Sequence, residues 1–307
     1  MRFSIITPYY KCFNLMRDYF NCLEKQTFRD FEVVVVDDAS NDEKAVEISK
    51  QLTELEIKNK VISNEKNYGP GVARNIGIQH ATGDYIFFLD ADDWIASNTM
   101  EMIDNLIKEN PRLECIAFDY KSVNVSGDET VHSILNSNNE PDLIKNINTS
   151  SWGKVYKKKF IAENKLEFYP AYLAEDFYFT ISAISLCKEF YHIKEPFYYY
   201  KQNGTSIVHN IKDEMIDKIK LIIDELYDRE YITIAEKDYF VLREYIYTLI
   251  IQRMGKKDEY IVDLLNNYPN KQFKQNLKNL KAHQRVIISL YKMKVYKLVE
   301  IGLKICS

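Results

Sequence analysis

Short, continuous apolar runs alternate with segments of helical apolar spacing over the first 95 residues. Four such runs are predicted strands, at residues 3–7, 31–36, 61–62 and 85–89. The intervening segments have helical periodicity, as with Ile48, Leu52 and Leu55 in a helix expected to begin near Asp42. Because apolar strands separated by helices are typical of a parallel sheet covered on both faces, this part of the chain is predicted to be α/β.

Polar residues follow three of these strands directly. Thr7 and Pro8 follow the first strand, Asp37 and Asp38 the second, and residues 90–93 (DADD) the fourth. Ligands of such sheets bind beyond the carboxyl ends of the strands, so these residues are expected to line one crevice. Their five carboxylates would repel one another unless some are protonated, or a metal ion and donor groups lie among them.

The acidic turn at residues 89–94 (LDADDW) has the composition of a metal site. Mg²⁺ and Mn²⁺ prefer oxygen ligands and commonly bridge protein carboxylates to phosphate oxygens, which favours a nucleotide-linked substrate. An acidic turn that caps the following helix would explain the same residues. The pair Asp37 and Asp38 on a neighbouring strand favours the metal interpretation.

Further elements are expected along the rest of the chain. Asn14 is a candidate cap for the first helix, and Asn98 with Glu101 forms a candidate capping box for a helix that ends near Glu109. The other expected elements are a strand at 114–120, a loop or irregular insertion at 123–150, a short helix at 158–164, a helix that opens at 175–176, a strand at 191–200, and helices from about 211. A domain boundary is therefore predicted near residue 210.

Composition excludes several classes of protein. The 307 residues hold 41 Lys and Arg against 45 Asp and Glu, a net charge of −4, so no global cationic field indicates a nucleic-acid partner. The five cysteines are scattered without a CxxC pair, which predicts neither a disulfide framework nor a cysteine zinc site. The N-terminal residues lack the pattern of a signal peptide, and no apolar stretch is long enough to span a membrane. A cytoplasmic location is the expectation.

Four segments match, in order and spacing, the motifs of a known family. Through them the chain resembles the family 2 glycosyltransferases over about residues 1–210. The segments are SIITPYY at 4–10, QTFRDFEVVVVDDAS at 26–40, NYGPGVARNIGIQHATGDYIFFLDADD at 67–93 and AEDF at 174–177. The resemblance implies a GT-A fold, an α/β nucleotide-binding sheet with helices on both faces. Residues 1–95 would bind the nucleotide sugar, 96–210 would bind the acceptor, and 211–307 would form a helical region.

The resemblance also implies roles for individual residues. Asp176 would be the catalytic base with Glu175 in support, Asp92 would bind Mn²⁺ or Mg²⁺ with His209 as a further ligand, and Trp152 would lie near the acceptor. The nucleotide would contact Thr7, Pro8, Tyr10, Asp38, Gly71, Arg74 and Asp90. Plainer interpretations stay open: a surface arginine for Arg74, a core or hinge residue for Trp152, a surface loop for His209, and an ordinary turn for Gly71.

The last 34 residues differ in charge from the rest of the chain. Segment 274–307 has eight basic residues and one acidic residue, a net charge of 8 − 1 = +7. Its apolar residues fall on one arc of a helical wheel: Ile287, Ile288, Tyr291, Val295, Leu298, Val299 and Ile305. This pattern fits either an amphipathic helix on an anionic membrane or a helix docked on the protein with solvated lysines.

The predicted function is an inverting glycosyltransferase. It would move a sugar from a nucleotide diphosphate sugar, commonly a UDP-sugar, to a glycan or lipid-linked acceptor hydroxyl in surface polysaccharide or glycoconjugate synthesis. A nucleotidyltransferase that makes sugar nucleotides is one alternative, although the Gly-rich loop expected after its first strand is missing from residues 4–13. A non-catalytic sugar-binding protein is the other.

Overall fold

The computed structural model describes residues 1–135, 143–171 and 174–202 and, with gaps, residues between 218 and 303. The chain divides into two compact units, one formed by residues 1–135 and 148–206 and the other by 136–147 and 207–307. The boundary predicted near residue 210 lies outside the described residues. Each unit is described by itself.

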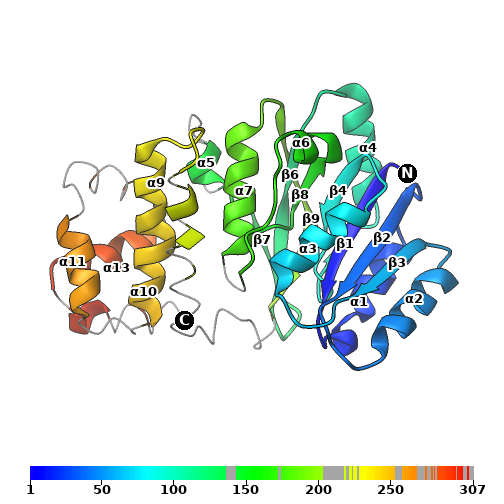
Figure 1. Ribbon diagram of the computed structural model, residues 1–307, viewed down its shortest axis with the longest axis horizontal. Helices are drawn as coiled ribbons and strands as arrows, with labels where there is room; N and C mark the ends of the chain where they lie inside the picture. The colour runs from blue at the N-terminus through cyan, green and yellow to red at the C-terminus, as the bar shows by residue number, and fades with distance from the viewer. Residues whose placement is uncertain are drawn as a thin grey trace. The chain divides into compact units, whose positions relative to one another are not determined.

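Unit 1 is built on one mixed sheet, and the part of the unit that the structure describes contributes nine strands to it. The strand order is β3-β2-β1-β4-β8-β6-β9-β5, and β7 pairs with β6. The strands are β1 (Phe3–Tyr9), β2 (Phe31–Asp37), β3 (Lys58–Ser63), β4 (Tyr85–Phe88), β5 (Trp94–Ile95), β6 (Cys115–Val123), β7 (Glu129–His132), β8 (Lys154–Lys157) and β9 (Phe190–Lys201). In Figure 1 the strands β3, β2, β1 and β4 stand side by side, with α2 (Lys44–Glu54) next to the edge strand β3.

The parallel sheet predicted from the apolar runs is confirmed for β1 to β4. The rest of the sheet is mixed, because β8 runs antiparallel to both β4 and β6, whereas β6 and β9 are parallel. Every residue of β2 is buried, as expected for a strand that is covered on both faces. The carboxyl ends of β2, β1 and β4 are therefore neighbours, as predicted.

The helices predicted in unit 1 are confirmed, but two predicted caps are wrong. Asn14 lies within a 3₁₀ turn (Phe13–Leu15) ahead of the first helix, and the Asn98 side chain makes no capping bond. Glu101 instead accepts a hydrogen bond from Thr27 Oγ1 at 2.7 Å, so a contact with a distant residue replaces the capping box. The remaining helices of unit 1 are α1 (Arg17–Glu24), α3 (Pro70–His80), α4 (Thr99–Glu109), α6 (Lys158–Glu163) and α7 (Glu175–Leu186).

The predicted loop over 123–150 contains two short elements. One is β7, which pairs with β6, and the other is α5 (Leu143–Asn146), which belongs to unit 2. Each element has four residues, too few to show a periodicity in the sequence.

Unit 2 is helical where the structure describes it, as predicted. Beside α5 it contains α9 (Ile234–Phe240), a π-helical turn (Val241–Ile246), α10 (Tyr247–Gln252), α11 (Glu259–Asn267) and α13 (Ala282–Lys292). Within the described residues, no helix is long and apolar enough to cross a membrane.

The apolar arc predicted for the C-terminal segment is largely packed within unit 2. Ile287, Ile288 and Tyr291 on α13 are buried, and α13 contacts α10 and α11. The Tyr291 hydroxyl accepts a hydrogen bond from the Asp258 backbone N–H at 2.8 Å. Val299 is also buried, whereas Leu298 is exposed, and Val295 and Ile305 lie outside the described residues. At these buried positions the docked interpretation of the helix is confirmed.

Candidate active site

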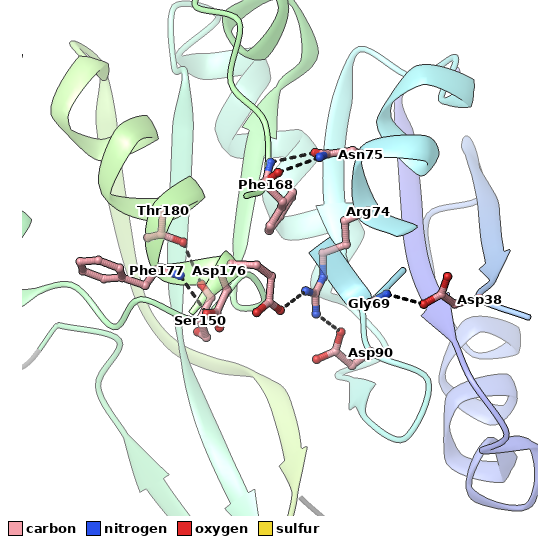
Figure 2. A network of polar contacts seen from close by, with 11 residues as sticks. Asp38, Gly69, Arg74, Asn75, Asp90, Ser150, Phe168, Asp176, Phe177 and Thr180 are labelled. Carbon is pink, nitrogen blue, oxygen red and sulfur yellow. Dashed lines mark hydrogen bonds and ion pairs between the residues drawn. The ribbon is translucent and has the colours of Figure 1, made fainter. Parts of the chain in front are cut away.

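Arg74 lies at the centre of a buried ionic network in unit 1. Its Nη2 is 2.8 Å from Asp90 Oδ1 (Figure 2). Its Nη1 is 3.0 Å from Glu175 Oε1. The guanidinium also lies over the ring of Phe168, 5.4 Å from the ring centroid. The side chain is only 6% exposed, so the interpretation of Arg74 as a surface residue is wrong.

Burial and the neighbouring carboxylates shift the pKa of Arg74 in opposite directions. Burial disfavours the charged guanidinium, but the attraction of Asp90 and Glu175 outweighs burial and raises the pKa of Arg74. Its Nε is buried without a hydrogen-bond partner among the residues that the structure describes. Arg74 is therefore a permanent cation that joins the acidic turn after β4 to the first turn of α7.

Glu175 is buried at the start of α7 against the start of α3. Burial raises the pKa of Glu175, and the Arg74 guanidinium offsets only part of that rise. Gly71 leaves the space that this side chain occupies, because a Cβ on Gly71 would lie 2.8 Å from Glu175 Cγ and 2.8 Å from the Tyr169 carbonyl oxygen. Glu175 and the Tyr169 carbonyl therefore leave room only for glycine at position 71.

Asp176 follows in the first turn of α7 and is only partly buried. Its Oδ1 accepts a hydrogen bond from the Phe177 backbone N–H at 2.8 Å (Figure 2). A carboxylate at a helix N-terminus is favoured by the helix dipole. Asp176 is therefore held next to the Arg74 network and is partly exposed.

Asp38 organises the turn that leads into α3. Its carboxylate accepts hydrogen bonds from Asn64 Nδ2 at 2.8 Å, from the Tyr68 N–H at 3.0 Å and from the Gly69 N–H at 2.7 Å. Gly69 has a φ of +93°, a conformation that glycine adopts without strain. The neighbouring Asp37 accepts from the Ser40 N–H at 2.9 Å, which agrees with a structural role.

The other residues predicted to contact the nucleotide differ in accessibility. Thr7 is fully buried, and its hydroxyl lies 2.8 Å from the Tyr19 hydroxyl. Pro8 is partly buried, and Tyr10 is 46% exposed. Tyr10 is exposed, with the Lys11 ammonium 5.2 Å from its ring centroid, whereas Thr7 supports the strand end from within the core.

The acidic turn carries closely spaced carboxylates. Asp93 is 1% exposed and accepts from the Tyr198 hydroxyl at 2.6 Å and from the Lys201 N–H at 2.8 Å. Burial, followed by the charges of Asp92 and Asp90, raises the pKa of Asp93 well above its ordinary value. Because these charges repel one another, a bound cation would be favoured here, and the donor set suits Mg²⁺ or Mn²⁺.

A complete metal site is not present within the described residues. They contain no cluster of three or more potential metal ligands. Asp93 is engaged by Tyr198 and Lys201, and Asp90 is paired with Arg74. His209, the further predicted ligand, lies outside the described residues. The turn fits a cation that takes its remaining ligands from a substrate.

Trp152 lies in an aromatic cluster. Its indole stacks on Tyr198 at 4.8 Å and on Tyr200 at 5.4 Å between ring centroids, with Tyr120 edge-on at 4.8 Å. Tyr198 also donates to Asp93, so one side chain connects the indole to the acidic turn. Trp152 is partly buried, and both the structural and the acceptor interpretations agree with this position.

Sequence reasoning missed two groups at the site, Asn75 and Lys154. The Asn75 side chain makes two hydrogen bonds to the backbone of Phe168 (Figure 2). Its Nδ2 donates to the Phe168 carbonyl at 2.8 Å, and its Oδ1 accepts from the Phe168 N–H at 2.8 Å. An asparagine in the middle of a predicted helix was a usable signal, since asparagine is a poor helix former. Lys154 is the second group, and no motif in the sequence around it indicates a role.

Comparison with known proteins gives consistent matches. A family model described as glycosyl transferase family 2 matches residues 4–168. Over 258 residues the chain is 28% identical to the poly(ribitol-phosphate) beta-N-acetylglucosaminyltransferase TarS of Staphylococcus aureus, a match that covers 80% of this chain and 44% of TarS. The chain spans 36 to 64% of the length of the first curated relatives that it matches.

Solved structures show the same fold. A structure of S. aureus TarS residues 1–349 with UDP-GlcNAc matches with a TM-score of 0.72 and 22% identity, over 99% of this chain and 91% of that one. The mannosyltransferase PcManGT of Pyrobaculum calidifontis, in complex with GDP-Man and Mn²⁺, matches with a TM-score of 0.58 and 13% identity, over 95% of this chain and 87% of that one. These likenesses establish the GT-A fold that was predicted.

Proposed function

The chain belongs to glycosyl transferase family 2, and from this premise we propose that it is an inverting glycosyltransferase that uses a UDP-sugar donor. One observation carries the proposal: Arg74 binds Asp90 in the acidic turn and Glu175, the neighbour of Asp176, at the same time. Arg74 thereby holds Asp90, which would contact the donor, close to Glu175, which would support the base that acts on the acceptor. Family membership favours sugar transfer over the nucleotidyltransferase alternative.

The donor nucleotide would bind at the carboxyl ends of β1, β2 and β4. Asp38 is the candidate for the uracil, because uracil N3–H is a donor and a carboxylate only accepts. Its existing bonds to the turn before α3 would orient it for this contact. Tyr10 would cover the base, and Asp90 would accept from the ribose. The relative TarS has been solved with UDP-GlcNAc, which supports a uridine nucleotide.

Asp176 is the proposed base. The acceptor oxygen attacks the anomeric carbon from the face opposite the nucleotide, the new glycosidic bond forms, and the bond to the diphosphate oxygen breaks with its electron pair. The acceptor hydroxyl proton goes to Asp176. Glu175 would support Asp176 through the Arg74 network.

A divalent cation fits the acidic turn. Asp92 would hold it, together with oxygens of the diphosphate, and His209 is the further candidate ligand. When bound, the cation would supply positive charge that stabilises the departing diphosphate. The Mn²⁺ in the structure of the related fold supports this assignment.

The acceptor would be a hydroxyl of a glycan, a polyol phosphate polymer or a lipid-linked glycan. The name of TarS, which describes transfer to poly(ribitol-phosphate), supports an acceptor of this class. Trp152 would contact it, since its ring cluster adjoins the acidic turn through Tyr198. The +7 charge of segment 274–307 supports peripheral contact with an anionic membrane, where lipid-linked acceptors are found.

A screen of UDP-sugars for release of UDP tests the proposal. We expect one or a few sugars to give UDP release that depends on Mn²⁺ or Mg²⁺ and rises when a polyol phosphate or glycan acceptor is added. The Asp176→Asn variant is the matched control, because it should bind the same donor without transfer. Absence of release from any UDP-sugar, with donor binding also absent, would refute the proposed donor class.

A further inference from the structure

Lys154, at the start of β8, is a lysine with 0% of its surface exposed. Burial of an ammonium group is costly unless it is paired and hydrogen-bonded, so this position requires an explanation. The proposed reaction does not use Lys154, and lysine is among the residue types least often fully buried. Its surroundings indicate what it does.

The ammonium of Lys154 holds the loop that carries Trp152. Its Nζ donates to the Ser150 carbonyl at 2.8 Å and, more weakly, to the Trp152 carbonyl at 3.4 Å. Gly153, with a φ of +71°, turns the chain between the loop and β8. Lys154 thus bonds back onto the segment just before it and fixes the backbone on both sides of Ser151.

The same loop is also bonded to α7. The Thr180 hydroxyl donates to the Ser150 carbonyl at 3.2 Å, so this oxygen accepts from both Lys154 and Thr180. Thr180 is one helical turn beyond Asp176 and on the same face of α7. Figure 2 shows Asp176, Ser150 and Thr180 close together on one side of the Arg74 network. Lys154 and Thr180 thus share the Ser150 carbonyl, and through it the loop of Trp152 is bonded to the helix of the proposed base.

Among the described residues, the titratable groups whose charges act on the ammonium are Cys115 on β6 and Asp176 on α7. Burial lowers the pKa of Lys154 to about 7, and the charges of Cys115 and Asp176 oppose that shift. Burial also raises the pKa of the Cys115 thiol well above its ordinary value, so Cys115 stays neutral near pH 7. Asp176 is then the anion that acts on the ammonium, and attraction between the two favours the ionised form of both. The charges of Arg74 and Tyr156 also interact with Asp176.

We propose that Lys154 is a positioning residue for the acceptor side of the reaction: it fixes the Trp152 loop against α7, and its charge favours the ionised form of Asp176. The inference rests on the proposed function, in which Asp176 is the base. A purely structural lysine would stabilise the loop without affecting how the activity depends on pH.

The Lys154→Met variant tests the charge, because methionine has a similar length and lacks the ammonium. We expect UDP binding within about twofold of the natural protein and a transfer rate lowered about tenfold or more. The acid limb of the pH–rate profile should move to higher pH, because Asp176 keeps Arg74 but loses the second cation that favours its carboxylate form. A folded variant with an unchanged acid limb would overturn the charge role.

The Thr180→Val variant is the matched control, since it breaks the bond to Ser150 without altering charge. It should lower the transfer rate and leave the acid limb in place. An unchanged rate would show that the position of the loop does not matter, which contradicts the other half of the proposal.

A measurement that does not depend on Lys154→Met folding uses the lysine itself. The titration of the Lys154 amine, followed by NMR of lysine labelled with ¹³C at Cε, should occur at lower pH in Asp176→Asn, because the ammonium loses its anion. An unchanged titration would refute the coupling. If Asp176→Asn instead kept full transfer, the proposed base would be wrong, so the two failures are distinguishable.

Discussion

Asp90, Arg74 and Glu175 show how single residues join distant parts of this chain. Arg74 and Glu175 are 101 residues apart in the sequence, and both are buried at their contact. In such a network, removal of one partner leaves an uncompensated buried charge, which typically costs about 3–5 kcal/mol. The effects of substitutions here therefore depend on which charge is removed, and on whether the replacement keeps the hydrogen bond.

Asp176→Asn should separate donor binding from catalysis. The amide keeps the size of the side chain and can still accept from the Phe177 N–H, but it cannot take up a proton. We expect UDP affinity within about twofold and turnover reduced about 10²-fold or more, measured by calorimetry and by transfer to acceptor. Turnover like that of the natural protein would show that another residue is the base.

Glu175→Gln should change how stability depends on pH. The folded-state pKa of Glu175 is raised by burial above its value of about 4.3 in the unfolded chain, so the folded protein binds this proton more tightly. The stability that the protonated Glu175 gives the folded protein is therefore complete at low pH and is lost as the pH rises through the folded-state pKa. The variant, which keeps an oxygen for Arg74, should lose less stability over that window.

Urea unfolding of the natural protein and of Glu175→Gln between about pH 4 and 8 measures how much stability each loses as the pH rises. Each unit of pKa difference would correspond to about 1.4 kcal/mol. Parallel stability curves for Glu175→Gln and the natural protein would contradict the expectation.

At the scale of elements, the close approach of α3 to α7 fixes the site. Gly71 and Asn75 lie one turn apart on α3, and they contact Glu175 and Phe168 respectively. The two contacts hold the start of α7 and the segment before it against α3, which packs on β1 and β2. Changes on this face of α3 should therefore affect both stability and activity.

The Gly71→Ala variant tests whether the close contact between α3 and α7 is required. The added Cβ would lie 2.8 Å from the Tyr169 carbonyl oxygen, which is backbone and yields little. We expect destabilisation of about 1–3 kcal/mol in urea unfolding and a lower transfer rate, because Glu175 and Asp176 must shift. Gln79→Ala, at an exposed position on α3, is the matched control and should alter neither quantity. Equal stability of the two variants would show that α3 can move away without cost.

The elements also show what the sequence could predict. Apolar runs and helical spacing predicted β1 to β4 and the helices between them, because most of these elements bury a regular set of side chains. The edge strand β3 buries none, and only its short apolar run indicated it. The antiparallel placement of β8 and the contact of Glu101 with Thr27 depend on pairing across the chain, which local patterns do not specify. Likewise, the motifs identified Arg74 and Glu175 as separate site residues, but their direct contact required the fold.

For the whole molecule, charge is distributed unevenly. Segment 274–307 has a charge of +7, so the remaining residues sum to −4 − 7 = −11. The buried side chains of α13 pack within unit 2, so they are not available for insertion into lipid. Any attraction to a membrane would therefore come mainly from exposed lysines such as Lys294 and Lys297.

This distribution of charge predicts that the protein binds anionic vesicles in a salt-sensitive way. Reversing the charge of exposed lysines in segment 274–307 should weaken that binding. Lys294→Glu/Lys297→Glu changes the segment from +7 to +3, and at about 1 kcal/mol per lysine near a negative surface it should weaken binding about tenfold or more. Truncation before Lys274 is a poorer test, because it would remove α13 from its contacts with α10 and α11.

Sedimentation with phosphatidylserine vesicles at about 0.1 M salt measures the binding, and about 1 M salt should abolish it as the Debye length falls from about 10 Å to about 3 Å. The matched control is Lys25→Glu/Lys188→Glu, which makes the same change in net charge at exposed positions of unit 1. Because only the position of the charge differs, the control should bind like the natural protein. Equal loss in both variants would mean that net charge alone governs the attraction, and failure of the natural protein to bind at low salt would refute membrane contact by this segment.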